Sequence, residues 1–174
     1  SAPDVKFIYE VPVNFEKDHI SESILKKLGL KPRTRDLKEW NALVRTIRNV
    51  REPIRIGIVG KYFGTGDFVL ADSYISVIEA IKHASYHFKR KPKIEWLNAE
   101  DFDPTARKDF KTQLKKLKNY HGVIVPGGFG ARGVEGKIQV IRYLRENRIP
   151  FFGLCYGMQL AVIEKARAIG LKNA

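Results

Sequence analysis

The fold of this chain is most clearly indicated by one stretch, Ile149-Pro150-Phe151-Phe152-Gly153-Leu154-Cys155-Tyr156-Gly157-Met158-Gln159. A short apolar run leads into Gly-x-Cys-x-Gly and then into a helical pattern, the cysteine counterpart of a nucleophile elbow. The small flanking residues permit a strained turn that presents a thiol at a helix N-terminus, where the helix dipole favours the thiolate. The stretch therefore predicts a nucleophilic Cys155. The competing interpretation is a buried structural cysteine, the commoner role of a lone Cys.

Strand and helix patterns alternate on both sides of this stretch from about residue 54 onward. The expected strands are 54–59, 93–97, 122–125 and 150–154, and the expected helices are 72–88, 104–118, 136–147 and 155–169. Such alternation is typical of a parallel sheet with crossover helices. We therefore expect an α/β fold with an open doubly wound parallel sheet, incomplete at its C-terminal end because only four strands are recognisable.

Residues before about 51 show a different pattern. Two helices are expected at 20–28 and 36–50, preceded by an extended segment at 7–13. This order is not that of a βαβ unit. We expect residues 1–18 to be the tail of a preceding domain, 19–52 a helical linker and 53–174 the N-terminal part of the α/β domain, so that the chain is a piece of a longer protein.

Composition narrows the class of protein. The chain has 174 residues, a formal net charge of +13 and one cysteine. No internal disulfide can form, and neither a signal peptide nor an apolar run of membrane-spanning length is recognisable, so we expect a cytoplasmic protein without a membrane partner. The basic runs at 89–93 and 111–118 are typical of solvated connections and helix faces. Phosphorylated small molecules or acidic surfaces are therefore better candidate partners than nucleic acid.

Two glycine-rich loops follow expected strands, at the sheet edge where open α/β sheets bind ligands. The loop at 126–133 offers unobstructed backbone amides, which suits an oxyanion hole, although a plain tight turn is the alternative. Its Gly-x-Gly-x-x-Gly spacing imitates a dinucleotide fingerprint, but the acidic ribose partner is missing. The loop at 60–67 lacks the ending of a phosphate loop, which excludes that motif.

A cysteine nucleophile needs a base, and none of the four histidines, His19, His83, His87 and His121, is convincingly placed. Two of them are one helical turn apart, but no companion ligands accompany them, and no metal site is predicted. Asp72 is expected to cap the helix that follows it. We expect the base to lie beyond residue 174.

These loops carry a family resemblance. Pro126-Gly127-Gly128-Phe129-Gly130, followed by the stretch around Cys155, resembles the class I (triad) glutamine amidotransferases. The segments at 7–12, 57–62, 72–80 and 132–136 narrow the resemblance to the CTP synthase family and extend it over essentially the whole chain. The resemblance implies a flavodoxin-like fold and a ligase that aminates UTP to CTP, using ATP and ammonia released from glutamine.

The resemblance also implies roles for individual residues. Cys155 would form the glutamyl thioester, Gly128 and Tyr156 would donate backbone N–H groups to the oxyanion, and the glutamine pocket would include Gly157, Met158 and Gln159. GTP, the allosteric activator of the family, would contact Phe129, Arg132, Gly133 and Glu135. Mg and ATP would bind largely outside this chain, with Asp4 and Val5 as the candidate contacts within it.

The chain also departs from the family pattern in two places. The His-x-Glu pair of the family is missing, so these residues alone are expected to be inactive, and the full-length protein is expected to form a homo-oligomer, a tetramer. The segment 63–71 is longer than in some relatives, and no role is assigned to it. The alternatives are a different triad glutamine amidotransferase and a non-catalytic α/β module for binding or oligomerisation.

Overall fold

Strand β1 (Pro53–Gly60) lies inside a sheet of four parallel strands. It pairs on one side with β2 (Lys91–Asn98) and on the other with β3 (Gly122–Val125), and β4 (Phe151–Gly153) extends the sheet beyond β3. The computed structural model describes residues 4–33, 36–60, 74–128, 132–171 and 174. The strand order β2-β1-β3-β4 confirms the expected parallel sheet. Because the order reverses between β1 and β3, the loops after these strands flank the switch point where such folds bind ligands.

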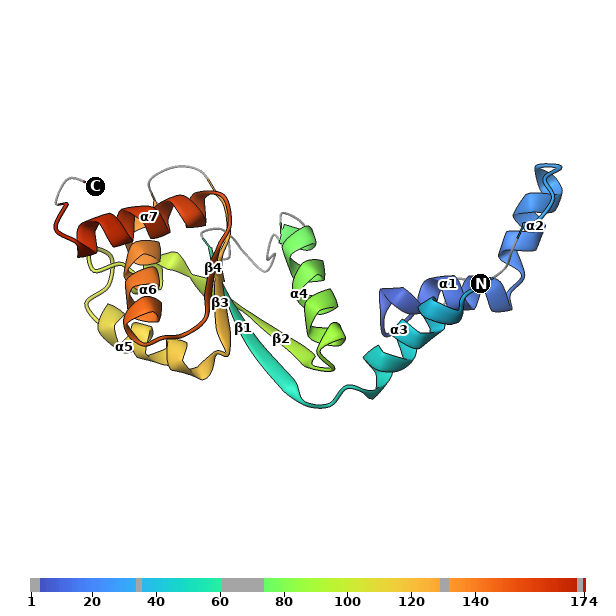
Figure 1. Cartoon of the computed structure of the whole chain (residues 1–174), viewed down its shortest axis with the longest axis horizontal. Coiled ribbons are helices and arrows are strands. Elements are labelled where there is room, and N and C mark those ends of the chain that lie inside the picture. Colours follow the sequence, from blue (N-terminus) through green and yellow to red (C-terminus); the bar gives the residue numbers. More distant parts are fainter. Residues whose placement is uncertain (1–3, 34–35, 61–73, 129–131, 172–173) are drawn as a thin grey trace. The chain divides into compact units, whose positions relative to one another are not determined.

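Helices cover both faces of this sheet. Helix α4 (Ile75–His87) lies on one face, and α5 (Phe110–Lys115), α6 (Val134–Glu146) and α7 (Tyr156–Ala168) lie on the other (Figure 1). The expected doubly wound architecture is therefore confirmed. Two short 3-10 turns, η3 (Ala99–Phe102) and η4 (Lys116–Asn119), continue the paths of β2 and α5.

The main core lies between the sheet and helices α5, α6 and α7. Its central residues, all enclosed, are Val59, Val123, Val125, Ile138, Val140, Ile141, Leu144 and Leu160. Those of α6 recur at helical spacing on one face, which is why this segment forms an amphipathic helix. The α4 face is packed less completely, because an apolar hollow of about 420 Å³ remains between α4 and strands β1, β3 and β4.

The segment before α5 departs from the sequence prediction. A single helix was expected over 104–118, but α5 begins only at Phe110. Asp103, which is buried, accepts hydrogen bonds from the backbone N–H of Thr105 at 2.8 Å and from its hydroxyl at 2.6 Å. This side chain closes a local turn that competes with helix formation, so the first part of the predicted helix is replaced by a turn.

Residues 1–51 form a separate unit. It contains η1 (Ile8–Glu10), α1 (Val11–Lys17), α2 (Ile20–Lys27) and α3 (Lys38–Asn49), so the two predicted helices are confirmed. The extended segment expected at 7–13 is wrong, because residues 8–13 are helical and only Phe7 is extended. Pro12 occupies the first turn of α1, where a missing N–H costs nothing, and Trp40 Nε1 donates to the Tyr9 carbonyl at 2.7 Å.

The boundary between the two units falls after Arg51. The assignment of residues 1–18 to a preceding domain and of 19–52 to a linker stays a prediction. Across the described residues, no helix combines the length and the apolar character needed to cross a bilayer. Asp72 and the segment 63–71 lie outside the described residues.

Candidate active site at the ends of β3 and β4

Cys155 joins β4 to α7 through a backbone conformation that few residues adopt. Its φ is 51° and its ψ is −110°, the strained combination expected of a nucleophile elbow. A β-carbon at Gly153 would lie 2.7 Å from the Gly157 carbonyl, and one at Gly157 would lie 1.9 Å from the Val125 oxygen. Both flanking positions therefore require glycine because α7 begins in direct contact with the strands. Cys155 is exposed, which disfavours a buried structural cysteine.

The loop after β3 passes directly beside this thiol. A β-carbon built on Gly127 would lie 3.7 Å from Cys155 Sγ, and the Leu154 N–H donates to the Val125 carbonyl at 3.0 Å. The structure thus brings together the two glycine-containing segments that are 28 residues apart in sequence, from position 127 to position 155. Gly128 follows Gly127 in this loop, while Phe129 lies outside the described residues.

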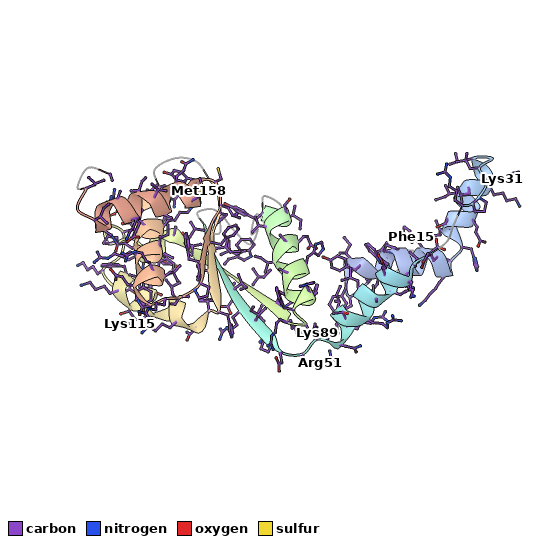
Figure 2. All side chains as sticks on the ribbon, in the orientation of Figure 1. Phe15, Lys31, Arg51, Lys89, Lys115 and Met158 are labelled. Carbon is purple, nitrogen blue, oxygen red and sulfur yellow. The ribbon has the colours of Figure 1, made fainter. Side chains whose placement is uncertain are left out.

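The first turn of α7 contains a backbone N–H group, that of Tyr156, for which no acceptor is described. The Gly157 N–H donates to the Leu154 carbonyl at 2.9 Å, and the Met158 and Gln159 N–H groups donate to the Cys155 carbonyl at 3.1 and 3.2 Å. Among the described residues, no acceptor is present for the Tyr156 N–H, as is usual at a helix start. Met158 and Gln159 are exposed, and Met158 marks the start of α7 in Figure 2, whereas Gly157 is buried against β3.

Lys137, on the first turn of α6, is a component of this region that sequence reasoning missed. It is completely buried, and its Nζ lies 6.0 Å from the centroid of the Tyr156 ring. The same Nζ would lie 3.8 Å from a β-carbon on Gly128. The amphipathic pattern of α6 contains no signal for this position, because a lysine beside apolar residues is usually placed at the rim of a helix face.

Among the described effector candidates, Arg132 and Gly133 lie against η3, whereas Glu135 pairs with a residue of α7. Arg132 makes a two-point ion pair with Glu100, one contact being 3.0 Å, and these hydrogen bonds lower the pKa of the Glu100 carboxyl. Gly133 has a φ of 71° and packs close to η3. Glu135 instead pairs with Arg167 of α7 at 2.9 and 3.0 Å.

No histidine described in residues 52–174 lies at the edge of the sheet that carries Cys155. His121 precedes β3, and its Nδ1 accepts the Arg55 backbone N–H at 3.0 Å. Because β3 and β4 are parallel, His121 and Cys155 mark opposite edges. His83 and His87 lie in the second half of α4, which runs back toward the edge of His121.

The two remaining predicted site residues, the candidate ATP contacts, lie in the unit formed by residues 1–51. Asp4 is exposed and Val5 is half-buried, and both belong to the unit formed by residues 1–51. Within the described ranges, no group of three or more His, Cys, Asp or Glu residues is arranged to hold a metal ion.

Comparison with known proteins places this geometry in a family context. Residues 69–173 match the family described as "Glutamine amidotransferase class-I". The chain is 46% identical over 175 residues to a CTP synthase of Pyrococcus abyssi, covering 100% of this chain and 30% of that protein. It is 45% identical over 172 residues to a CTP synthase of Sulfolobus acidocaldarius, covering 98% of this chain and 31% of the relative. The chain thus spans less than a third of the length of these relatives.

A solved structure is also similar. It is described as the glutaminase domain of Trypanosoma brucei CTPS with bound acivicin, with 36% identity and a TM-score of 0.57. The match covers 66% of this chain and 40% of that one. Because the family match extends over more than half of the chain and includes both β3 and the elbow, this chain belongs to the class-I glutamine amidotransferase family.

Proposed function

We propose that this chain is the glutaminase part of a CTP synthase, in which glutamine hydrolysis at Cys155 supplies ammonia for the ATP-dependent amination of UTP to CTP. The observation that carries the proposal is the strained elbow at Cys155, with its thiol exposed and with Gly127 beside it. The similarity to CTP synthases along the whole chain supports this choice over a triad amidotransferase with another acceptor.

The chemistry follows from the positions of these groups. The Cys155 thiolate attacks the carboxamide carbon of glutamine, a C–S bond forms, and the carbonyl oxygen becomes an oxyanion. The N–H groups of Gly128 and Tyr156 are the proposed donors to that oxygen, and donors held in place in advance are most effective there. The C–N bond then breaks, the amine takes up a proton and leaves as ammonia, and water hydrolyses the thioester to glutamate.

The proton transfers in this sequence need a base. None of the described histidines in residues 52–174 lies beside Cys155, as the opposite placement of His121 shows. We therefore expect these residues alone to form a covalent adduct at Cys155 but not to turn over glutamine.

The direct test is covalent labelling followed by intact-mass measurement. A chloroketone analogue of glutamine should add once to the chain, with a rate that saturates, and excess glutamine should protect against it. Cys155→Ala should abolish the addition, and chloroacetone, which carries the same chloroketone without the amino-acid portion, is the matched control reagent. Labelling that neither saturates nor is slowed by glutamine would contradict the glutaminase proposal and favour a non-catalytic module.

The nucleotide partners belong to the same proposal. For Mg and ATP, the described part of residues 1–18 contributes no carboxylate cluster, so no catalytic step is assigned to this chain there. Among the described residues, the exposed Arg132 is the best candidate for GTP binding. Its guanidinium pairs with the Glu100 carboxylate and can exchange this partner for a phosphate. UTP-dependent ATP hydrolysis by a full-length protein containing this sequence would distinguish a CTP synthase from another triad amidotransferase.

A further inference from the structure

A completely buried lysine, Lys137, lies close to both the loop after β3 and the first residue of α7. Lys137 has no exposed surface, although lysine is among the residues least often enclosed in proteins. Its Nζ lies over the Tyr156 ring, 6.0 Å from the ring centroid. At this distance an ammonium group is attracted by the face of the ring. It also lies close to Gly128, where a β-carbon would be 3.8 Å away. One cation therefore neighbours both proposed oxyanion donors.

Tight packing keeps this lysine where it is. The preceding residue, Gly136, faces η3 so closely that a β-carbon would lie 1.9 Å from the Ala99 oxygen. The Lys137 N–H donates to the Gly133 carbonyl at 3.1 Å. The first turn of α6 is therefore held by η3 on one side, just as the first turn of α7 is held by β3 at Gly157. The side chain of Lys137 spans the space between these two fixed turns.

The charge of this lysine has an electrostatic consequence for the site. Enclosing an ammonium group is unfavourable, so a protein keeps one only where other groups compensate for the lost hydration. In surroundings with little water, a fixed positive charge interacts more strongly with negative charge than it would at the surface. In the proposed reaction, negative charge develops on the oxygen held by Gly128 and Tyr156, which are the neighbours of Lys137.

We propose that Lys137 is a positioning residue for glutamine hydrolysis: its buried ammonium orients Gly128 and Tyr156 and favours the negative charge that develops on the substrate oxygen they bind. This inference rests on the proposed function. Lys137 acts through these two residues and not on the thiol, so its removal should slow the formation of the acyl-enzyme more than simple alkylation of Cys155.

The test uses a substrate that needs no catalytic base. The p-nitrophenyl ester of the glutamate side-chain carboxyl acylates a thiolate through a tetrahedral oxyanion. A C–S bond forms, the C–O bond breaks, and p-nitrophenolate leaves with the electron pair. In Lys137→Met the saturated single-turnover rate should fall about tenfold, less than for loss of a direct oxyanion donor. The half-saturating ester concentration should stay within about twofold, because ground-state binding is unchanged.

Iodoacetamide provides the comparison, because it alkylates the thiolate without forming an oxyanion. Its rate should change less than about threefold in Lys137→Met, since thiolate reactivity is not altered. Lys165→Met, which removes the same charge from the exposed side of α7, should leave both rates unchanged. Thermal unfolding must show that each variant is folded, and Lys137→Gln takes the place of Lys137→Met if the latter does not fold.

Each outcome decides between the two proposals. Equal losses with the ester and with iodoacetamide, or no loss with either, would overturn the role of Lys137 and leave the glutaminase proposal intact, provided that glutamine still protects the wild-type chain. A wild-type chain that the ester does not acylate, or that glutamine does not protect, would overturn both.

Discussion

Tyr120 lies just before β3, at the edge of the sheet opposite Cys155, and its hydroxyl donates to Glu95 Oε2 at 2.7 Å. Arg55 Nη2 donates to the other oxygen of the same carboxylate at 3.1 Å. Burial and the neighbouring Glu95 together raise the pKa of Tyr120 to about 12. The hydrogen bonds from Tyr120 and Arg55 lower the pKa of Glu95. Tyr120, Glu95 and Arg55 therefore form a hydrogen-bonded network at this edge of the sheet, with Tyr120 protonated and Glu95 ionised.

This network predicts a pH dependence of stability. Between the ordinary tyrosine pKa of 10.0 and about 12, folded Tyr120 keeps a proton that the unfolded chain releases, so its contribution to stability is lost as pH rises. The contribution of Glu95 to stability changes with pH in the opposite direction. It is present above the ordinary glutamate pKa of 4.5 and is lost as pH falls through the lowered pKa of the folded state.

Urea unfolding across pH tests this prediction. The difference in unfolding free energy between the wild type and Tyr120→Phe should shrink from pH 10 to 12, and that between the wild type and Glu95→Gln should shrink below pH 4.5. Subtracting the variant removes the titration of all other groups. Differences that stay constant across both pH ranges would show that the network does not control these protonation states.

At the scale of the elements, the position of α7 depends on two close approaches of backbone to backbone. Gly153 meets the first turn of the helix, and Gly157 meets the end of β3. These contacts place the N-terminus of α7 at Cys155. The positive end of the helix dipole and the Tyr156 N–H group therefore lie next to the proposed nucleophile. The same packing explains why the elbow can be strained: the residues around it are held on both sides.

We predict that Gly157→Ala destabilises the protein by about 3 kcal/mol or prevents folding, because the new methyl group would overlap the Val125 carbonyl at 1.9 Å. The control is Gly170→Ala, just beyond α7, where φ is 100° but no atom lies within 4 Å of an added β-carbon. It should cost about 1 kcal/mol through backbone conformation alone. Chemical denaturation measures both, and equal values would refute the role assigned to this contact.

At the scale of the whole chain, the α/β unit contains its own core. Every member of the main hydrophobic cluster, buried or partly buried, lies between residues 97 and 163 apart from Val59 of β1. No described residue of 1–51 belongs to this cluster. A domain whose core is complete without a neighbouring segment is expected to fold without it.

We predict that residues 52–174 alone unfold cooperatively, with a midpoint within a few degrees of that of the full chain, and retain the labelling of Cys155. Residues 1–51 alone should lose most of their helix, because helices α1, α2 and α3 have only 7, 8 and 12 residues. Circular dichroism during heating distinguishes these cases. A non-cooperative transition for 52–174 would show that the first unit is needed for the fold.

Much of the α/β unit could be predicted from the sequence because its signals are local. Alternating apolar runs and amphipathic helices placed all four strands, and β3 was predicted with its observed bounds at 122–125. The two wrong assignments also have local causes. Residues 7–13 are rich in aromatic and β-branched side chains, as strands are, yet Pro12 fits a first helical turn. The buried carboxylate of Asp103 forms a turn inside a stretch with helical periodicity.

Local sequence patterns were sufficient to predict the parallel α/β order, the elbow at Cys155 and the glycine loop that faces it, because strand periodicity and glycine positions act over short distances. Three features could be seen only after the chain had packed: Lys137 is enclosed beside Gly128 and Tyr156, Glu135 pairs with Arg167, and no described histidine of residues 52–174 lies at the edge of the sheet that carries Cys155. Such contacts join elements that are distant in sequence, and whether a charge is buried depends on which surfaces meet when the chain packs.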